Sequence, residues 1–198
     1  MINREESKQQ ALLSLNGLSV GDAIGEQLLR SYPVFNWDAR IPAGPLPWTD
    51  DTHMALSIVE VLCQEGGINQ DHLAQRFADR YAEEPGRGYS SATSKFLTRL
   101  GKGGDWRALT RERFSTGSYG NGAAMRAAPI GGFFAGNPAK AAEQAALSAE
   151  VTHAHPEGIA GAAAVAAAAS LAAAGWNEEP EALLEKTLLH LPEGEVSS

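Results

Sequence analysis

Residues 158–174 read GIAGAAAVAAAASLAAA, and eleven of these seventeen residues are alanine. The segment from Gly158 to Trp176 carries no charged residue and reaches the length of a membrane-spanning helix. Alanine, however, transfers into hydrocarbon only weakly compared with leucine, acidic residues flank the segment, and no basic cluster sets an orientation. The composition therefore predicts a buried helix whose small side chains let neighbouring helices approach closely.

On both sides of this segment the sequence predicts helices that are separated by short segments rich in Gly, Pro and Asn. Apolar residues recur at helical spacing, and capping residues such as Asn69 and Asn137 precede them. Helices are predicted over residues 6–28, 50–65, 70–84, 91–100, 122–134, 138–152, 156–174 and 180–191. No segment shows a convincing alternation of β-branched residues, and no linker is long enough to separate domains. The sequence predicts an all-α fold and a single domain over residues 1–198.

The overall composition restricts the partners and the compartment. The 198 residues include 16 Lys and Arg against 24 Asp and Glu, which gives a net charge of −8. An acidic surface repels polyphosphate, so neither a nucleic-acid partner nor an anionic membrane surface is expected. Cys63 is the single cysteine, and the amino-terminal residues are polar and charged without an apolar signal core. We therefore expect a soluble, cytoplasmic protein with no membrane partner.

Three glycines recur at intervals of four in GLSVGDAIGE, residues 17–26, and so share one face of the first predicted helix. Each glycine costs about 1 kcal/mol relative to alanine inside a helix. Either very close helix packing or a ligand that needs bare backbone would offset this cost. Asp22 and Glu26 lie one turn apart beside the glycines, where two carboxylates repel each other unless a cation or a shared proton relieves them. Both explanations stay open at this point.

The segment WTDDT, residues 48–52, begins the second predicted helix. Thr and Asp are preferred at helix N-caps, so capping alone explains part of this motif. A cap needs only one side chain, whereas this segment offers two carboxylates between two hydroxyls. Hard oxygen ligands from a short segment suit Mg²⁺ or Ca²⁺, with water completing the coordination shell. Thr49, Asp50 and Asp51 are therefore candidate metal ligands.

A Gly/Asn-rich loop, GSYGNGAAMR at residues 117–126, opens onto an apolar helix. Such a loop exposes backbone N–H groups that favour phosphate oxygens or a sugar diol, and Arg126 would add a charge-assisted contact. The alternative is a flexible turn followed by a helix with Arg126 in solvent. Further along, His153 and His155 have no third nitrogen or sulfur ligand nearby, so they favour hydrogen bonding to backbone or ligand over zinc binding.

Four segments, GLSVGDAIGE, WTDDT, GSYGNGAAMR and THAHPEGIAGA, follow one another in this chain. In this order they resemble the ADP-ribosylglycohydrolase family, which includes dinitrogenase-reductase-activating glycohydrolases, and the resemblance runs from about Gly17 to Leu191. It implies a compact multi-helix orthogonal bundle around a pair of Mg²⁺ or Mn²⁺ ions. It also implies hydrolysis of the bond at the anomeric carbon of ADP-ribose attached to arginine, serine or another acceptor.

The resemblance assigns roles to individual residues. Thr49, Asp50 and Asp51 match the family's first metal ligands, and His153 and His155 match the segment that contacts the adenosine side of the ligand. The residues expected to bind the rest of ADP-ribose are Asp22, Gly120, Asn121, Gly122, Ala124, Met125 and Arg126. The catalytic candidates are Asp50, Asp51 and Glu26, and the proton relay is expected from Asp51 or Glu26.

Two departures from the family pattern affect this expectation. Many members carry a glutamate seven residues after the aspartate of the GDAxG segment, where this chain has Leu29, and Glu26 is the only acid placed to substitute for it. The family's second metal motif, Gly-Asp-x-Asp-Thr, has no counterpart because no aspartate follows Asp105. We therefore expect the N-terminal portion of the fold, truncated at its C-terminus, with an incomplete second metal site.

These observations support one main functional hypothesis and two alternatives. The main hypothesis is a Mg²⁺-dependent hydrolase that removes ADP-ribose from a modified protein or small molecule. The first alternative is a non-catalytic relative that binds ADP-ribose or another nucleotide, or serves a structural role, without the second metal motif. The second is a truncated product that folds poorly because it exposes an unpartnered apolar face.

Overall fold

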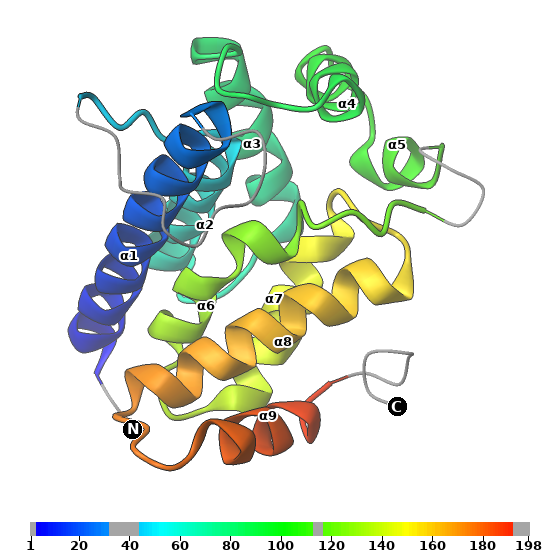
Figure 1. Ribbon diagram of the computed structural model, residues 1–198. Coiled ribbons are helices and arrows are strands. Elements are labelled where there is room, and N and C mark those ends of the chain that lie inside the picture. The colour runs from blue at the N-terminus through cyan, green and yellow to red at the C-terminus, as the bar shows by residue number, and fades with distance from the viewer. Residues whose placement is uncertain (1–2, 32–43, 113–116, 192–198) are drawn as a thin grey trace.

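The computed structural model describes residues 3–31, 44–112 and 117–191, and within these ranges it contains helices and no strand (Figure 1). This confirms the predicted all-α class. In chain order the elements are α1 (Arg4–Ser31), α2 (Asp50–Glu65), α3 (Gln70–Glu83), α4 (Ser91–Gly101), α5 (Trp106–Glu112), the 3₁₀ helix η1 (Ala124–Arg126), α6 (Ala128–Phe133), α7 (Pro138–Glu150), α8 (Pro156–Ala173) and α9 (Pro180–Leu188).

The predicted capping residues begin and end the helices as expected. The Asn69 side chain accepts a hydrogen bond from the backbone N–H of His72 at the start of α3, and Asn137 accepts one from Lys140 at the start of α7. Gly66 ends α2 with a left-handed φ of 80°, and its N–H donates to the Leu62 carbonyl. Local sequence therefore sets most helix boundaries through side-chain caps and a C-terminal glycine.

Two elements differ from the sequence prediction. The single helix predicted over residues 122–134 is divided into η1 and α6, with Ala127 between them. Pro129 occupies the first turn of α6, where its missing N–H and its ring disfavour continuation of a helix from before it. Helix α5 was not predicted because its seven residues are too short to show a clear helical period.

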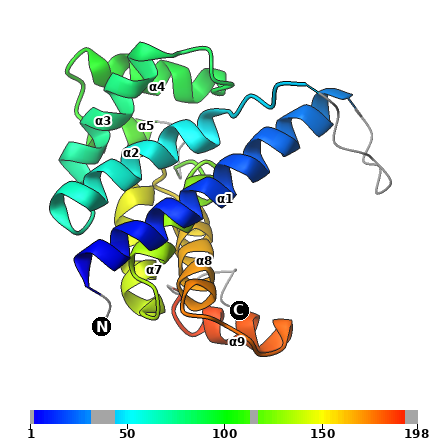
Figure 2. The same ribbon diagram turned by 90° about the vertical axis from the view of Figure 1, so that its left-hand side faces the viewer.

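The short helix α6 is wedged between α1 and α8. A Cβ atom at Gly131 would lie 2.3 Å from the Ala166 carbonyl oxygen of α8, and one at Gly132 would lie 2.6 Å from the Gln10 carbonyl oxygen of α1. Figure 2 shows α1 beside α2 and crossing in front of α8, as this arrangement requires. The closest packing in the bundle therefore depends on the absence of side chains at Gly131 and Gly132.

Helix α8 is the alanine-rich element predicted from residues 158–174. By length and composition alone it could cross a membrane, but a single helix of this kind is weak evidence because core helices pass the same test. It packs mainly against α7 and α6, and it buries Gly158, Ala160, Ala162, Ala163, Ala166, Ala167 and Ser170. These contacts agree with the prediction of a helix that others approach closely, while the expected absence of a membrane partner stays a prediction.

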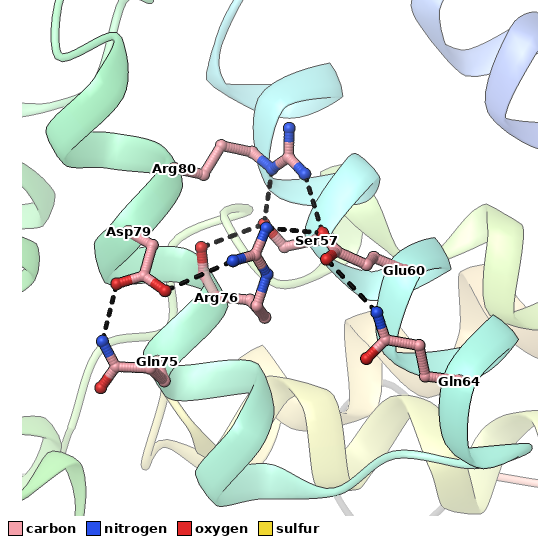
Figure 3. A network of polar contacts seen from close by, with 7 residues as sticks. All are labelled: Ser57, Glu60, Gln64, Gln75, Arg76, Asp79 and Arg80. Carbon is pink, nitrogen blue, oxygen red and sulfur yellow. Dashed lines mark hydrogen bonds and ion pairs between the residues drawn. The ribbon is translucent and has the colours of Figure 1, made fainter.

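Helices α2 and α3 are joined by a polar network as well as by apolar packing (Figure 3). One oxygen of the Glu60 carboxylate lies 2.8 Å from a guanidinium nitrogen of Arg76 and 3.0 Å from one of Arg80. The Arg80 Nε also donates to the Ser57 hydroxyl at 3.0 Å. Because Arg80 lies in the last turn of α3, the network fixes the point from which the chain leaves this helix toward α4.

The glycine row of α1 differs from the close-packing expectation. Among the residues that the structure describes, no atom lies within 4 Å of a Cβ built at Gly17, Gly21 or Gly25. Helices α2 and α6 contact α1 mainly through other residues, including the buried Ala11 and Leu15. Close packing within the described part of the chain therefore does not explain these three glycines.

We predict opposite stability changes for alanine at Gly131 and at Gly21. Gly131→Ala should lower the free energy of unfolding by about 2 kcal/mol, because its Cβ would overlap the α8 backbone. Gly21→Ala should raise it by roughly 0.5–1 kcal/mol, because alanine favours a helix interior and finds open space there. Urea unfolding followed by circular dichroism measures both, and equal stability of the two variants would contradict the assigned packing.

Candidate functional site

Asp22 of α1 holds the N-terminus of α2. Its carboxylate accepts hydrogen bonds from the backbone N–H and hydroxyl of Thr49 at 2.8 and 2.7 Å, and from those of Thr52 at 3.2 and 2.6 Å. The Thr49 side chain makes no capping hydrogen bond of its own. Asp22 therefore caps α2 from a different helix. This structural role differs from the substrate contact predicted for Asp22, which itself stays a prediction.

The two aspartates that follow Thr49 are crowded by other carboxylates. Burial, together with the neighbouring charge of Asp51, raises the pKa of Asp50 from 3.8 to about 6. Burial and the charge of Asp22 likewise raise the pKa of Asp51, which a hydrogen bond from the Thr49 hydroxyl partly opposes. The folded protein thus holds two carboxylates that a nearby cation would stabilise in their charged forms.

Glu26 lies near this pair but already has a cationic partner. Its carboxylate lies 2.6 Å from Arg30 guanidinium nitrogens, one turn further along α1. Its charge contributes to the raised pKa values of both Asp50 and Asp51, which places it in their electrostatic surroundings. Leu29, at the position where many family members carry glutamate, is 73% exposed.

The Gly/Asn-rich loop and the histidine segment are interlocked through glycines. A Cβ at Gly117, which has a φ of +85°, would lie 2.6 Å from the backbone nitrogen of His155. Conversely, a Cβ at Gly158 would lie 2.9 Å from the Ser118 carbonyl oxygen. A Cβ at Gly122 would lie 3.1 Å from the imidazole of His153. The loop is therefore braced against the start of α8, in contrast to the flexible turn considered from sequence.

One cavity of about 250 Å³ brings the two halves of the predicted site together. Asp50 and Met54 of α2 line it together with residues of the loop and of the histidine segment. The predicted residues that line this cavity are Asp50, Gly120, Asn121, Gly122, Met125, Arg126 and His153. The predicted residues that do not line it are Asp22, Glu26, Thr49, Asp51, Ala124 and His155.

Arg126 is 1% exposed and forms part of the cavity floor. Its guanidinium donates to the Ser148 carbonyl and the Thr152 hydroxyl, both at 2.9 Å, and lies 3.5 Å from the Met54 sulfur. It also sits 4.5 Å from the centroid of the Phe77 ring. These contacts exclude the alternative of a solvated arginine and connect α2, α3, α7 and η1 beneath the cavity.

The two histidines have different surroundings. His153 is buried, its Nδ1 lies 2.7 Å from the Thr152 hydroxyl, and its ring faces Gly122 in the cavity. His155 is the N-cap of α8, because its Nδ1 accepts a hydrogen bond from the Glu157 backbone at 3.2 Å. Its ring centroid lies 4.8 Å from that of Tyr119, whose side chain is 70% exposed. His153 thus belongs to the cavity, and His155 belongs to its outer edge.

Sequence reasoning missed several cavity residues that carry hydroxyl groups. Ser90 caps α4, and both Ser90 and Thr93 line the cavity. Ser118 and Thr152 also line the cavity, and their neighbours in sequence had been singled out. A serine N-cap signal was present at Ser90, but nothing in the sequence indicated that α4 would point its first turn at this cavity.

The residues at the start of α2 fit one hard divalent cation. The Thr49 hydroxyl and the carboxylates of Asp50 and Asp51 are oxygen donors of the kind that Mg²⁺ and Mn²⁺ prefer. Burial and neighbouring carboxylates raise their pKa values, so a cation would stabilise their charged forms. Within residues 3–31, 44–112 and 117–191, no group of three or more His, Cys, Asp or Glu side chains is placed to hold a metal ion. Water would complete the shell of a single ion.

Known proteins are similar to this chain in both sequence and fold. A solved structure described as an ADP-ribosylglycohydrolase-related protein complex superimposes with a TM-score of 0.63 at 27% identity, covering 92% of this chain and 62% of that chain. ADP-ribosylhydrolase ARH3 of Xenopus tropicalis is 39% identical over 154 residues, or 76% of this chain and 43% of the relative. The ADP-ribosyl-(dinitrogen reductase) glycohydrolase of Rhodospirillum rubrum is 27% identical over 161 residues, or 74% of this chain and 52% of the relative.

The alignments cover between 40% and 52% of the length of the ARH3 relatives; the alignment to human ARH3, at 35% identity, covers 43% of that protein. The profile of the ADP-ribosylglycohydrolase family matches residues 3–198. The order of the four motifs and the helical fold agree with this match. This chain belongs to the ADP-ribosylglycohydrolase family.

Proposed function

We propose that this chain carries the catalytic aspartates and the ADP-ribose loop of a hydrolase that cleaves the glycosidic bond at the anomeric carbon of ADP-ribose, with Mg²⁺ or Mn²⁺ as cofactor. The substrate would be a protein or small molecule that carries ADP-ribose. Family membership supports the reaction class. The metal and the acceptor are inferences from the site.

The observation that carries this proposal is the shared cavity between Asp50 and the segment Gly120–Gly122. A carboxylate that favours a cation and a braced loop of glycine backbone face the same space, as hydrolysis next to a bound diphosphate would require. The cavity volume of about 250 Å³ is below the usual range of small-molecule pockets, roughly 300–1,000 Å³. ADP-ribose would therefore extend past its edge, toward the rings of Tyr119 and His155.

Cleavage at an anomeric carbon passes through a state with oxocarbenium character, so the site must move a proton and stabilise positive charge on the ribose. A divalent cation at Thr49, Asp50 and Asp51 would orient the ribose hydroxyls. Asp51 is better suited than Glu26 to carry the proton, because its pKa is raised whereas Glu26 is held by the Arg30 cation. His153 and the Gly120–Gly122 backbone would hold the ligand.

We predict that Asp51→Asn abolishes hydrolysis. Removal of a group that transfers a proton and binds the cation should lower kcat/KM at least 100-fold while the helical circular dichroism spectrum stays unchanged. Release of ADP-ribose from serine-linked and arginine-linked peptides, with 5 mM Mg²⁺, measures the loss. Asp105→Asn, which changes an exposed aspartate between α4 and α5, is the matched control and should keep wild-type turnover. Unchanged turnover in Asp51→Asn would refute the assignment.

A second prediction concerns pH and metal. Because the folded pKa of Asp50 is raised from 3.8 to about 6, its contribution favours folding fully below pH 3.8 and is lost as pH rises through 6. Without metal, Asp50→Asn should therefore raise the Tm at pH 7.5 by about 3 °C, corresponding to about 1 kcal/mol at this partly exposed site, and should not raise it at pH 4.

Mg²⁺ should reverse the order of the two Tm values at pH 7.5, so that the wild-type chain becomes more stable than Asp50→Asn. At pH 7.5, Mg²⁺ should raise the Tm of the wild-type chain and leave that of Asp50→Asn nearly unchanged. His53, whose pKa burial lowers to about 4, loses its stabilising effect as pH falls, but it is common to both proteins and cancels in their difference. Differential scanning calorimetry measures these shifts. A wild-type Tm that does not respond to Mg²⁺ would contradict a cation site at Asp50.

A non-catalytic ADP-ribose-binding role is the second candidate. The observation that favours it is that the described residues hold no cluster of three metal-ligating acids, histidines or cysteines. Calorimetric titration with ADP-ribose, with and without Mg²⁺, separates the two functions. Binding together with turnover supports the hydrolase, whereas binding without turnover on either peptide supports the binding role.

A further inference from the structure

The connection between α3 and α4 contacts the aspartate-bearing turn of α2 at three consecutive residues. The Arg87 guanidinium lies 3.6 Å from the ring centroid of Trp48. A Cβ at Gly88 would lie 3.5 Å from the Thr49 Cβ and 3.7 Å from a carboxylate oxygen of Asp50. The turn is thus contacted both by this connection and by Asp22 of α1.

The third contact is a partly buried hydrogen bond. The Tyr89 hydroxyl lies 2.9 Å from Nδ1 of His53, which is 3% exposed and lies one helical turn after Asp50. The His53 ring also lies 5.5 Å from the Trp48 ring, centroid to centroid, so the pair joins the residue before the turn to the residue after it. Neither Tyr89 nor His53 lines the cavity, and both are therefore placed to act on the turn and not on a ligand.

Gly88 allows this close approach. Its φ of +86° is in the left-handed region that residues with a side chain rarely adopt. This conformation carries the chain past Asp50 while Arg87 and Tyr89 reach Trp48 and His53. Since Arg80 and Arg76 fix the end of α3 on Glu60, the segment starts from a fixed point (Figure 3).

We propose that Arg87, Gly88 and Tyr89 form a positioning segment that fixes the Asp50 carboxylate for a divalent cation, with Tyr89 acting through His53. This inference rests on the proposed function, because it assigns the segment a role toward the same cation site. Outer groups that orient metal ligands typically change metal affinity 10–100-fold when removed. The segment would thus set how tightly the cation binds without touching the substrate.

The test is the affinity of the full chain for Mn²⁺, measured by electron paramagnetic resonance of free Mn²⁺. Tyr89→Phe removes only the hydroxyl and should weaken Mn²⁺ binding about tenfold, while kcat and KM for an ADP-ribosylated peptide at saturating Mn²⁺ stay within twofold of wild type. Tyr81→Phe makes the same chemical change on the ring that packs edge-on against Tyr89 at 5.1 Å, and it should bind Mn²⁺ like the wild type.

A double variant tests whether Tyr89 acts through His53. If the hydrogen bond carries the effect, His53→Leu should weaken Mn²⁺ binding, and adding Tyr89→Phe to it should cause less than a twofold further loss. A full tenfold further loss would overturn this route. Arg87→Ala, which changes a surface contact and should fold if Tyr89→Phe does not, should weaken Mn²⁺ binding about threefold.

The outcomes separate this inference from the proposed function. If the wild type binds Mn²⁺ and hydrolyses its substrate, but Tyr89→Phe and Arg87→Ala bind Mn²⁺ equally well, the positioning role is wrong and the proposed function stands. If the wild type binds no Mn²⁺, both are wrong. A loss of kcat at saturating Mn²⁺ without a change in Mn²⁺ affinity would also overturn the positioning role.

Discussion

The Asp22 carboxylate is the interaction on which the rest of the site depends. It accepts four hydrogen bonds, two from Thr49 and two from Thr52, and thereby joins α1 to the first turn of α2. A helix N-terminus leaves backbone N–H groups without partners inside the helix, and here an aspartate from another helix satisfies two of them. Because Asp22 supplies the cap, Asp50 and Asp51 are not used for it. The helix therefore begins with two carboxylates available to a cation.

This arrangement has an electrostatic cost that favours metal binding. Burial is the main cause of the raised pKa values of Asp50 and Asp51, and the neighbouring charges of Asp22 and Glu26 raise both further. The positive end of the α2 dipole opposes this repulsion, and Arg30 pairs with Glu26. A site in which the folded chain holds carboxylates against their mutual repulsion gains more from a divalent cation than a site with balanced charge. Under the proposed function, the same residues would account both for a lower stability without metal and for binding of a divalent cation.

The sequence predicts this molecule well wherever the deciding interactions are local. Caps at Asn69 and Asn137 and the glycine at Gly66 are read directly from neighbouring residues, and they set the helix boundaries. Contacts between distant segments are not predictable in this way. Arg126 looked like a ligand contact or a solvated side chain, yet its buried partners lie at Met54, Ser148 and Thr152. The glycine row of α1 likewise resembles a packing face, whereas the glycines that permit close packing are Gly131 and Gly132 of α6.

The glycines of the Gly/Asn-rich loop and of the start of α8 depend on each other, which is why the order of the motifs indicates the family better than any single motif does. Gly117 is needed because the His155 backbone lies against it, and Gly158 is needed because the Ser118 backbone lies against it. The two segments lie about 40 positions apart in the sequence, and each restricts which residues the other can carry. A loop held in this way has little conformational entropy left to lose when a diphosphate binds, which favours affinity. The same bracing places Gly122 against His153, so the loop and this histidine form one continuous part of the cavity that Asp50 also lines.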